Sequence, residues 1–481
     1  MSLATRIGSW LRPAAYLGRN PLTLLGTVLT TSSAFTLIGF WFFDLAIGGT
    51  IHPYVGLIFF LVLPGIFVIG LLLMPVGALW RRVRLARAGE LPAIYPRVDF
   101  SMSDVRRVFG WVAALTFANV VIFSIASYRG VEYMDSARFC GQTCHIVMQP
   151  EFTAYQNSPH QRVACVQCHI GPGASWFVRS KLSGLHQVYA VTFHTYERPI
   201  PSPVENLRPS RETCEQCHWP QLFTGNKLVV IRKFTDDEKN TELTTVMLLK
   251  IGGHTWEGAL GIHGRHLDEQ HPIQYIATDR QRQTIAQVSY TDASGRPVVF
   301  TSTDTKPTPR QLSAPPRTMD CVDCHNRPTH TYQLPERALD EAMAQGRISP
   351  DLPYIKKQAI EVLKASYSDR DTAARQIAAA LEDFYRKSYP EVYRDKQSVL
   401  ESSIAGVQAV YLRNIFPAMN VTWGTYPNNL GHMDFPGCFR CHDGSHSTAD
   451  GKTIPNDCDT CHTMLAVDDP SPKILSDLGI K

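Results

Sequence analysis

The chain of 481 residues has no low-complexity tract, almost no excess of charge of one sign and no cysteine outside a repeated pattern. Lysine and arginine number 47 against 43 aspartates and glutamates, a formal net charge of +4. Such a balance gives no reason to expect a nucleic-acid partner. The length exceeds the usual share of a single domain, so we expect several.

All twelve cysteines fall into six pairs, and a histidine directly follows each pair. Five pairs read C-x-x-C-H and one, CGQTCH, reads C-x-x-x-C-H. One pair alone could be a redox dithiol or half of a zinc site, and disulfides would explain the even number, but none of these requires six histidines. The pattern predicts six covalent haems, in which both thiols join the vinyl groups and the histidine binds the iron. The sites are Cys140/Cys144–His145, Cys165/Cys168–His169, Cys214/Cys217–His218, Cys321/Cys324–His325, Cys438/Cys441–His442 and Cys458/Cys461–His462.

Three uncharged apolar runs, Leu22–Phe43, Pro53–Trp80 and Val108–Tyr128, lie near the amino terminus. Each reaches the length of about 20 residues that a helix needs to cross a bilayer. The first run is too long for a signal-peptide core and lacks a clear cleavage site, so we expect it to be retained.

Arginine is distributed unevenly around these runs. It precedes the first run and fills the link between the second and third, whereas the link Asp44–His52 has no lysine or arginine. Positive segments stay cytoplasmic, so everything after Tyr128 is expected outside, in the periplasm of a bacterium. Covalent haem attachment takes place on that same side. We therefore expect a protein of the bacterial inner membrane with its haem domain in the periplasm.

The fold class that we predict is a membrane-anchored multihaem cytochrome c, with a haem-packed, mostly α or irregular periplasmic domain and a small β-rich insertion. Short β-branched runs between the third and fourth sites, among them Lys227–Phe234 and Pro297–Thr303, indicate the insertion. The stretch from Glu336 to Leu412 is typical of helices. The predicted parts are residues 1–128, a membrane domain with three helices; 129–220, a module with three haems; 221–320, the insertion; and 321–481, a helical module with haems four to six.

The second ligand of each iron has to come from outside the motifs. Two protein ligands give an iron that changes oxidation state with little rearrangement, as electron transfer requires. The outer domain has ten histidines outside the motifs. The candidates that we favour as ligands are His160, His330, His432 and the pair His263 and His266.

The segments FCGQTCHIVMQPEFTAYQNSPH, CVQCHIGPGASWFVRSKLSG and ETCEQCHWP follow the third apolar run in this order. Over Val108–Pro220 the chain resembles the NapC/NirT/NrfH family of membrane-anchored multihaem quinol dehydrogenases. The resemblance implies that quinol is oxidised at the outer membrane surface and that closely packed haems pass electrons to a periplasmic cytochrome or reductase. It also implies that the first haem lies nearest the quinol, with Met148 as a ligand and Lys181 in the quinol pocket. The first site departs from the usual C-x-x-C-H-x-M of the family.

Two extra spans, the insertion and three further sites exceed the small tetrahaem pattern, so the chain resembles a larger branch that feeds respiratory chains ending outside the cell. The function that we predict is quinol oxidation with electron transfer through six haems c. A terminal reductase of a small oxidised substrate is an alternative, although no motif has lysine in place of its histidine. The other alternative is a non-catalytic subunit of a larger membrane complex, in which the haems only conduct electrons.

Overall fold

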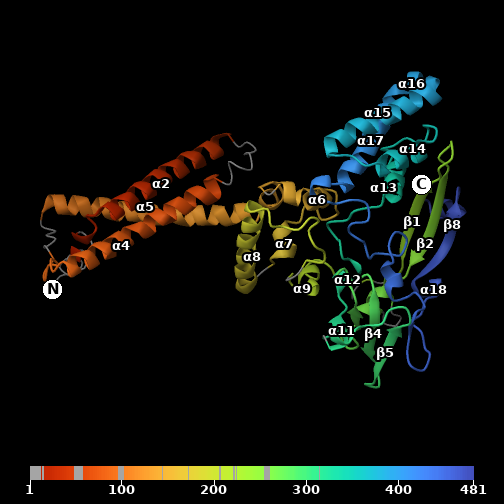
Figure 1. Ribbon diagram of the computed structural model, residues 1–481, viewed down its shortest axis with the longest axis horizontal. Helices are drawn as coiled ribbons and strands as arrows, with labels where there is room; N and C mark the ends of the chain where they lie inside the picture. Colours follow the sequence, from red (N-terminus) through yellow and green to blue (C-terminus); the bar gives the residue numbers. More distant parts are fainter. Residues whose placement is uncertain are drawn as a thin grey trace. The chain divides into compact units, whose positions relative to one another are not determined.

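The computed structural model describes residues 12–13, 16–47, 58–95, 102–143, 145–171, 173–204, 207–219, 223, 225–253, 261–313 and 315–480. The chain divides into two compact units, Met1–Cys144 and His145–Lys481. Figure 1 labels many of the elements of both units. The division into four parts stays a prediction.

The first unit is built from three long apolar helices, as the sequence predicts. They are α2 (Pro21–Ile47), α4 (Leu63–Arg87), which continues the turn η1 (Ile58–Val62), and α5 (Ser103–Met134). The stretches Pro21–Phe42, Ile58–Arg87 and Phe109–Met134 are long and apolar enough to cross a membrane. Helix α5 extends beyond Tyr128, where the apolar run ends, and Arg129 and Glu132 form an ion pair three residues apart on this extension.

Small residues let α2 and α4 approach closely. A Cβ atom on Gly70 would stand 2.5 Å from Oγ1 of Thr30, and one on Gly77 would stand 2.6 Å from Oγ1 of Thr23. The hydroxyl of Thr23 also donates to the carbonyl of Met74 at 3.1 Å. Helices in lipid associate through such close packing, since apolar burial drives them little there.

The second unit carries its cysteine motifs on short helical turns. These are α7 (Cys165–His169), α9 (Ser210–Cys214), α12 (Cys321–Cys324), η5 (Gly437–Arg440) and α18 (Cys458–Cys461). Helix α6 (His145–Gln156) precedes them, and α8 (Ala174–Thr192) lies between the second and third motifs. Residues three apart share one face of a helical turn, which suits two thiols that join one haem.

The predicted β runs are strands of two antiparallel sheets. One sheet has the order β1 (Lys227–Phe234), β2 (Glu242–Leu249), β8 (His462–Asp469). The other has the order β6 (Arg317–Thr318), β3 (Gln274–Ala277), β4 (Ile285–Thr291), β5 (Pro297–Ser302), β7 (His446–Ser447). The insertion is therefore not self-contained, because β7 and β8 come from the last part of the chain. These strands pair with β5 and β2, whose backbone groups would otherwise lack partners.

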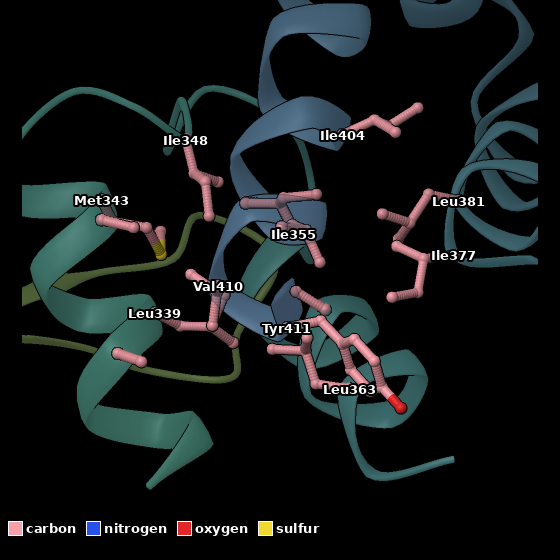
Figure 2. Close-up of a cluster of buried hydrophobic side chains, with 14 of the residues drawn as sticks. Leu339, Met343, Ile348, Ile355, Leu363, Ile377, Leu381, Ile404, Val410 and Tyr411 are labelled. Carbon is pink, nitrogen blue, oxygen red and sulfur yellow. The ribbon is translucent and has the colours of Figure 1, made fainter. Parts of the chain in front are cut away.

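The helical stretch that the sequence predicts forms a bundle without any cysteine motif. Its helices are α13 (Pro335–Ala344), α14 (Ile355–Lys364), α15 (Arg370–Ser388), α16 (Pro390–Asp395) and α17 (Gln397–Asn414). Figure 2 shows side chains from several of these helices gathered in one core, among them Leu339, Ile355 and Leu381, which have no exposed surface. The remaining short elements are α10 (Ile262–His266), α11 (Pro309–Ser313), η4 (Pro417–Met419) and α19 (Lys473–Asp477).

Candidate haem-binding site

Five of the six motif histidines face a histidine from elsewhere in the second unit. The distances between ring centroids fall in a narrow range. The pairs are His169–His330 at 6.2 Å, His218–His160 at 6.1 Å, His325–His263 at 6.4 Å, His442–His266 at 5.8 Å and His462–His432 at 6.1 Å. All five candidates that the sequence suggests as second ligands thus lie opposite a motif histidine.

The spacing of these pairs fits one metal ion between two imidazoles. A bond from imidazole nitrogen to a transition metal measures about 2.0–2.1 Å, so two rings on opposite sides of one ion stand roughly 6 Å apart between centres. Within the described ranges, no group of three or more His, Cys, Asp or Glu side chains converges to hold a metal. The spacing of each pair fits the iron of a haem, for which the protein would supply two histidine ligands.

Several of the paired rings are fixed through their Nδ1 atoms. Nδ1 of His266 contacts the carbonyl of Ile262 at 2.8 Å, and Nδ1 of His442 contacts the carbonyl of Pro455 at 2.6 Å. Nδ1 of His160 makes a longer contact, 3.4 Å, with a backbone carbonyl. When Nδ1 carries the proton and donates, Nε2 is free to bind a metal.

Burial favours the neutral form of the paired histidines. It lowers the pKa of His266 and of His263 below the usual value. The pKa of His169 is lowered by burial first and then by the neighbouring His330, although Glu151 opposes the shift. An imidazole has to be neutral to bind a metal, so these environments suit ligands.

The attachment peptides of sites two to six follow one another in space in chain order. Cys168 of site two has Cys214 of site three as an electrostatic neighbour, and Cys214 shares a side-chain hydrogen bond with Cys321 of site four. Burial raises the pKa of Cys441 in site five to about 12, with Cys324 of site four among its neighbours. Cys438 of site five lies near Cys461 of site six.

Cys217, the second predicted attachment residue of site three, is not enclosed by the protein. Helix α9 ends at Cys214, so Cys217 lies outside the helical turn that carries its partner. Cys217 is exposed, whereas Cys214 is partly buried. The amide of Cys217 donates to the carbonyl of Cys214 at 3.1 Å, which keeps the two residues on one tight bend of the chain. The two thiols therefore differ in burial, and the attachment of haem at Cys217 stays a prediction.

The first site begins directly after the third long helix. The turn η2 (Phe139–Thr143) contains Cys140 and begins after a link of four residues from the end of α5. The ring of Tyr133 on α5 lies 5.0 Å from that of Phe60 and 5.4 Å from that of Phe139, between centroids. These contacts hold Cys140 at the end of the helical unit. Cys144 lies outside the described residues.

Lys181 lies on α8, where its ammonium group stands 4.7 Å from the centre of the Phe177 ring. Val178 and Leu185 precede and follow it by three and four residues, which places all three on one helix face. Both apolar side chains are more than half exposed. Lys181 thus stands within an exposed apolar stripe.

The other histidines of this unit have different surroundings. His446 is buried, with Nε2 3.1 Å from the carbonyl of Ile285 and Nδ1 near Asp443, so hydrogen bonds occupy both nitrogens. His271 contacts Asp268. His186 and His194 are exposed, and His254 lies outside the described residues.

Sequence reasoning missed the polar groups around His330. Its Nδ1 atom lies 3.1 Å from one carboxylate oxygen of Glu151, and Arg327 contacts the other carboxylate oxygen at 3.2 Å. No local pattern marks these residues, since 179 positions separate His330 from Glu151.

Comparison with known proteins agrees with the resemblance. Residues 102–200 match the NapC/NirT cytochrome c family, N-terminal region. The chain is 45% identical over 460 residues to the cytochrome c-type protein ImcH of Geobacter sulfurreducens, an alignment that covers 94% of this chain and 89% of ImcH. The chain belongs to the NapC/NirT cytochrome c family.

A second relative in the NapC/NirT family is the cytochrome c-type protein NrfH of Wolinella succinogenes. It is 27% identical over 116 residues, which are 22% of this chain and 65% of NrfH. No solved structure matches. Family membership confirms the prediction of an electron-transport cytochrome c with covalent haem and a membrane anchor.

Proposed function

We propose that this cytochrome oxidises a membrane quinol and passes the electrons through six c-type haems to a periplasmic cytochrome or reductase. The observation that carries the proposal is the set of five histidine pairs, each spaced for one iron. When bound, haem supplies reversible one-electron chemistry, which suits the two electrons of a quinol taken one at a time.

In this proposal the paired histidines of sites two to six would be the two protein ligands of each haem iron. A terminal reductase needs an open position for its substrate, so the pairs speak against that activity at these five sites. The contiguous attachment peptides favour a path that runs along the chain from site two to site six.

The first site is the proposed point of electron entry. The five residues between α5 and Cys140 span at most about 18 Å when fully extended, so this site stays close to the end of the helix. Met148 follows His145 by three residues on α6 and is proposed as a ligand of the first haem, as His145 is.

Lys181 is the proposed donor of a hydrogen bond to a quinol oxygen. An exposed apolar helix face is typical of a helix that lies at the bilayer interface, where quinol enters and leaves the lipid. A lysine inside such a stripe is well placed to donate a hydrogen bond to the polar ring of a quinol that enters from the membrane. A lysine that contacts only lipid headgroups is the competing explanation.

The decisive experiment mixes the purified full-length protein with reduced menaquinol or ubiquinol analogues and follows haem reduction. The variant Lys181→Leu is expected to slow reduction by quinol and to leave reduction by dithionite unchanged. Arg179→Leu is the matched control, because Arg179 lies on the same helix and contacts Trp176 through its guanidinium at 5.0 Å. Equal quinol rates in Lys181→Leu and the parent would remove Lys181 from the site.

If the parent protein itself does not oxidise quinol, the alternative is favoured in which it is a non-catalytic electron-transfer subunit. Another membrane protein would then supply its electrons. Purification with its partners retained would then identify that complex.

A further inference from the structure

His330 differs from the other paired histidines in what surrounds its Nδ1 atom. Nδ1 lies 3.0 Å from the backbone carbonyl of Glu151 and 3.1 Å from Oε2 of the same residue. The Nδ1 contacts of His160, His266 and His442 in the described ranges are with neutral backbone carbonyls. His330 is thus a paired ring beside a full negative charge.

Arg327 holds this carboxylate in place. One guanidinium nitrogen lies 3.2 Å and 3.4 Å from the two carboxylate oxygens of Glu151, and Nε donates to the carbonyl of His330 at 2.8 Å. The guanidinium also lies 4.1 Å from the centre of the Tyr426 ring. Arg327 and Glu151 have only 8% and 13% of their side chains exposed. Water therefore screens neither charge well.

The two charges act on a metal-bound imidazole in opposite directions. A carboxylate that accepts a hydrogen bond from Nδ1–H makes the ring a stronger electron donor, and its charge favours the ferric ion over the ferrous one. Arg327 favours the ferrous ion, but its guanidinium contacts the carboxylate and the His330 carbonyl and makes no contact with the ring nitrogen. The carboxylate is closer to the ring, so a lowered reduction potential is the expected net result.

We propose that Glu151 is a positioning residue that gives haem two the lowest reduction potential among haems two to six, with Arg327 limiting the effect. The inference rests on the proposed ligation of that haem by His169 and His330. Haem two is the first site after the proposed entry point. Because its reduction potential is low, haem two would be reduced readily only by electrons from a strongly reducing quinol. From haem two the electrons would pass to haems of higher potential.

The test uses charge-removing substitutions in the full-length protein and a redox titration followed by electron paramagnetic resonance. Glu151→Gln keeps an acceptor for Nδ1 and removes the charge, so the potential of haem two is expected to rise. Arg327→Gln leaves the carboxylate uncompensated, so the potential is expected to fall. Each change should alter the ferric-to-ferrous ratio at least tenfold, which corresponds to about 59 mV for one electron. Mere loosening of the site would shift both variants in the same direction.

His330→Met identifies the signal of haem two, because it converts that haem from two histidine ligands to one. Asp340→Asn is the control, since Asp340 pairs with the buried Lys356 in the helical bundle and is similarly covered, at 14% exposed. It should leave all potentials unchanged. Shifts of the same sign in the two charge variants, or no shift, would overturn the role of Glu151. Unchanged signals in His330→Met would instead overturn the proposed ligation itself.

Discussion

Helix α10 carries two of the proposed ligands, and a single small substitution should therefore affect two haems at once. His263 faces His325 of site four and His266 faces His442 of site five. Gly261, directly before the helix, packs against the end of β2. A Cβ atom there would stand 2.5 Å from the amide nitrogen of Gly252 and 2.6 Å from the carbonyl oxygen of Lys250.

Gly261→Ala must therefore shift α10, because backbone atoms cannot move aside as a flexible side chain can. We expect two of the five haems with two histidine ligands, two fifths of that low-spin signal, to change in the paramagnetic resonance spectrum. His263→Met and His266→Met should each change one haem, with a rise in its potential because methionine replaces histidine. Six haems should remain attached in each variant, since the cysteines are untouched.

Gly252→Ala is the matched control, because a Cβ atom there meets its nearest neighbours at 3.5 Å, an ordinary contact. Its spectrum should equal that of the parent. If Gly261→Ala changes the signal of only one haem, the inference that α10 supplies ligands to two haems would be wrong. A parental spectrum in either methionine variant would refute the corresponding ligand.

The remaining predictions concern the haem number, the topology and the helical bundle. Mass spectrometry of the denatured protein should show six haem additions, and five would mean that the C-x-x-x-C-H motif at Cys140 is not an attachment site. A reporter fused after Gly89 should be active only if it works in the cytoplasm, so periplasmic activity there would overturn the orientation. Leu381→Ala should lower the free energy of unfolding of the bundle by about 2–5 kcal/mol, because Leu381 has no exposed surface. Hydrogen exchange in α13–α17 measures this loss, and unchanged exchange would contradict the core shown in Figure 2.

Local patterns in the sequence predict much of this fold. The runs Lys227–Phe234 and Pro297–Thr303 are strands in the structure to within one residue, because β-branched residues between turn signals suit a half-buried sheet. The three apolar runs are helices for the equally local reason of length and hydropathy. The helix Arg370–Ser388 follows the same logic, with Asp369 accepting a hydrogen bond from the amide of Thr372 at its start.

Local patterns do not predict which residues far apart in the chain pair with one another. The sequence provides five candidate histidines, but it does not say which motif each of them faces. His330 lies five residues after His325, yet it faces His169. Likewise β8, which begins with His462, pairs with β2 more than two hundred residues earlier. Contacts at such separations depend on the closure of long loops, which leaves no periodic signal in the sequence.

One short loop of the second unit contributes to or contacts the proposed ligand pairs of several haem sites. Both histidines of the loop His325–His330 belong to proposed ligand pairs, one with His263 and the other with His169. The carbonyl of Pro328 in the same loop contacts His160, which faces His218. A loop of six residues therefore touches the ligand sets of sites two, three and four. Displacement of this loop should disturb three neighbouring sites together, so its conformation is a structural requirement for the part of the path nearest the proposed quinol end.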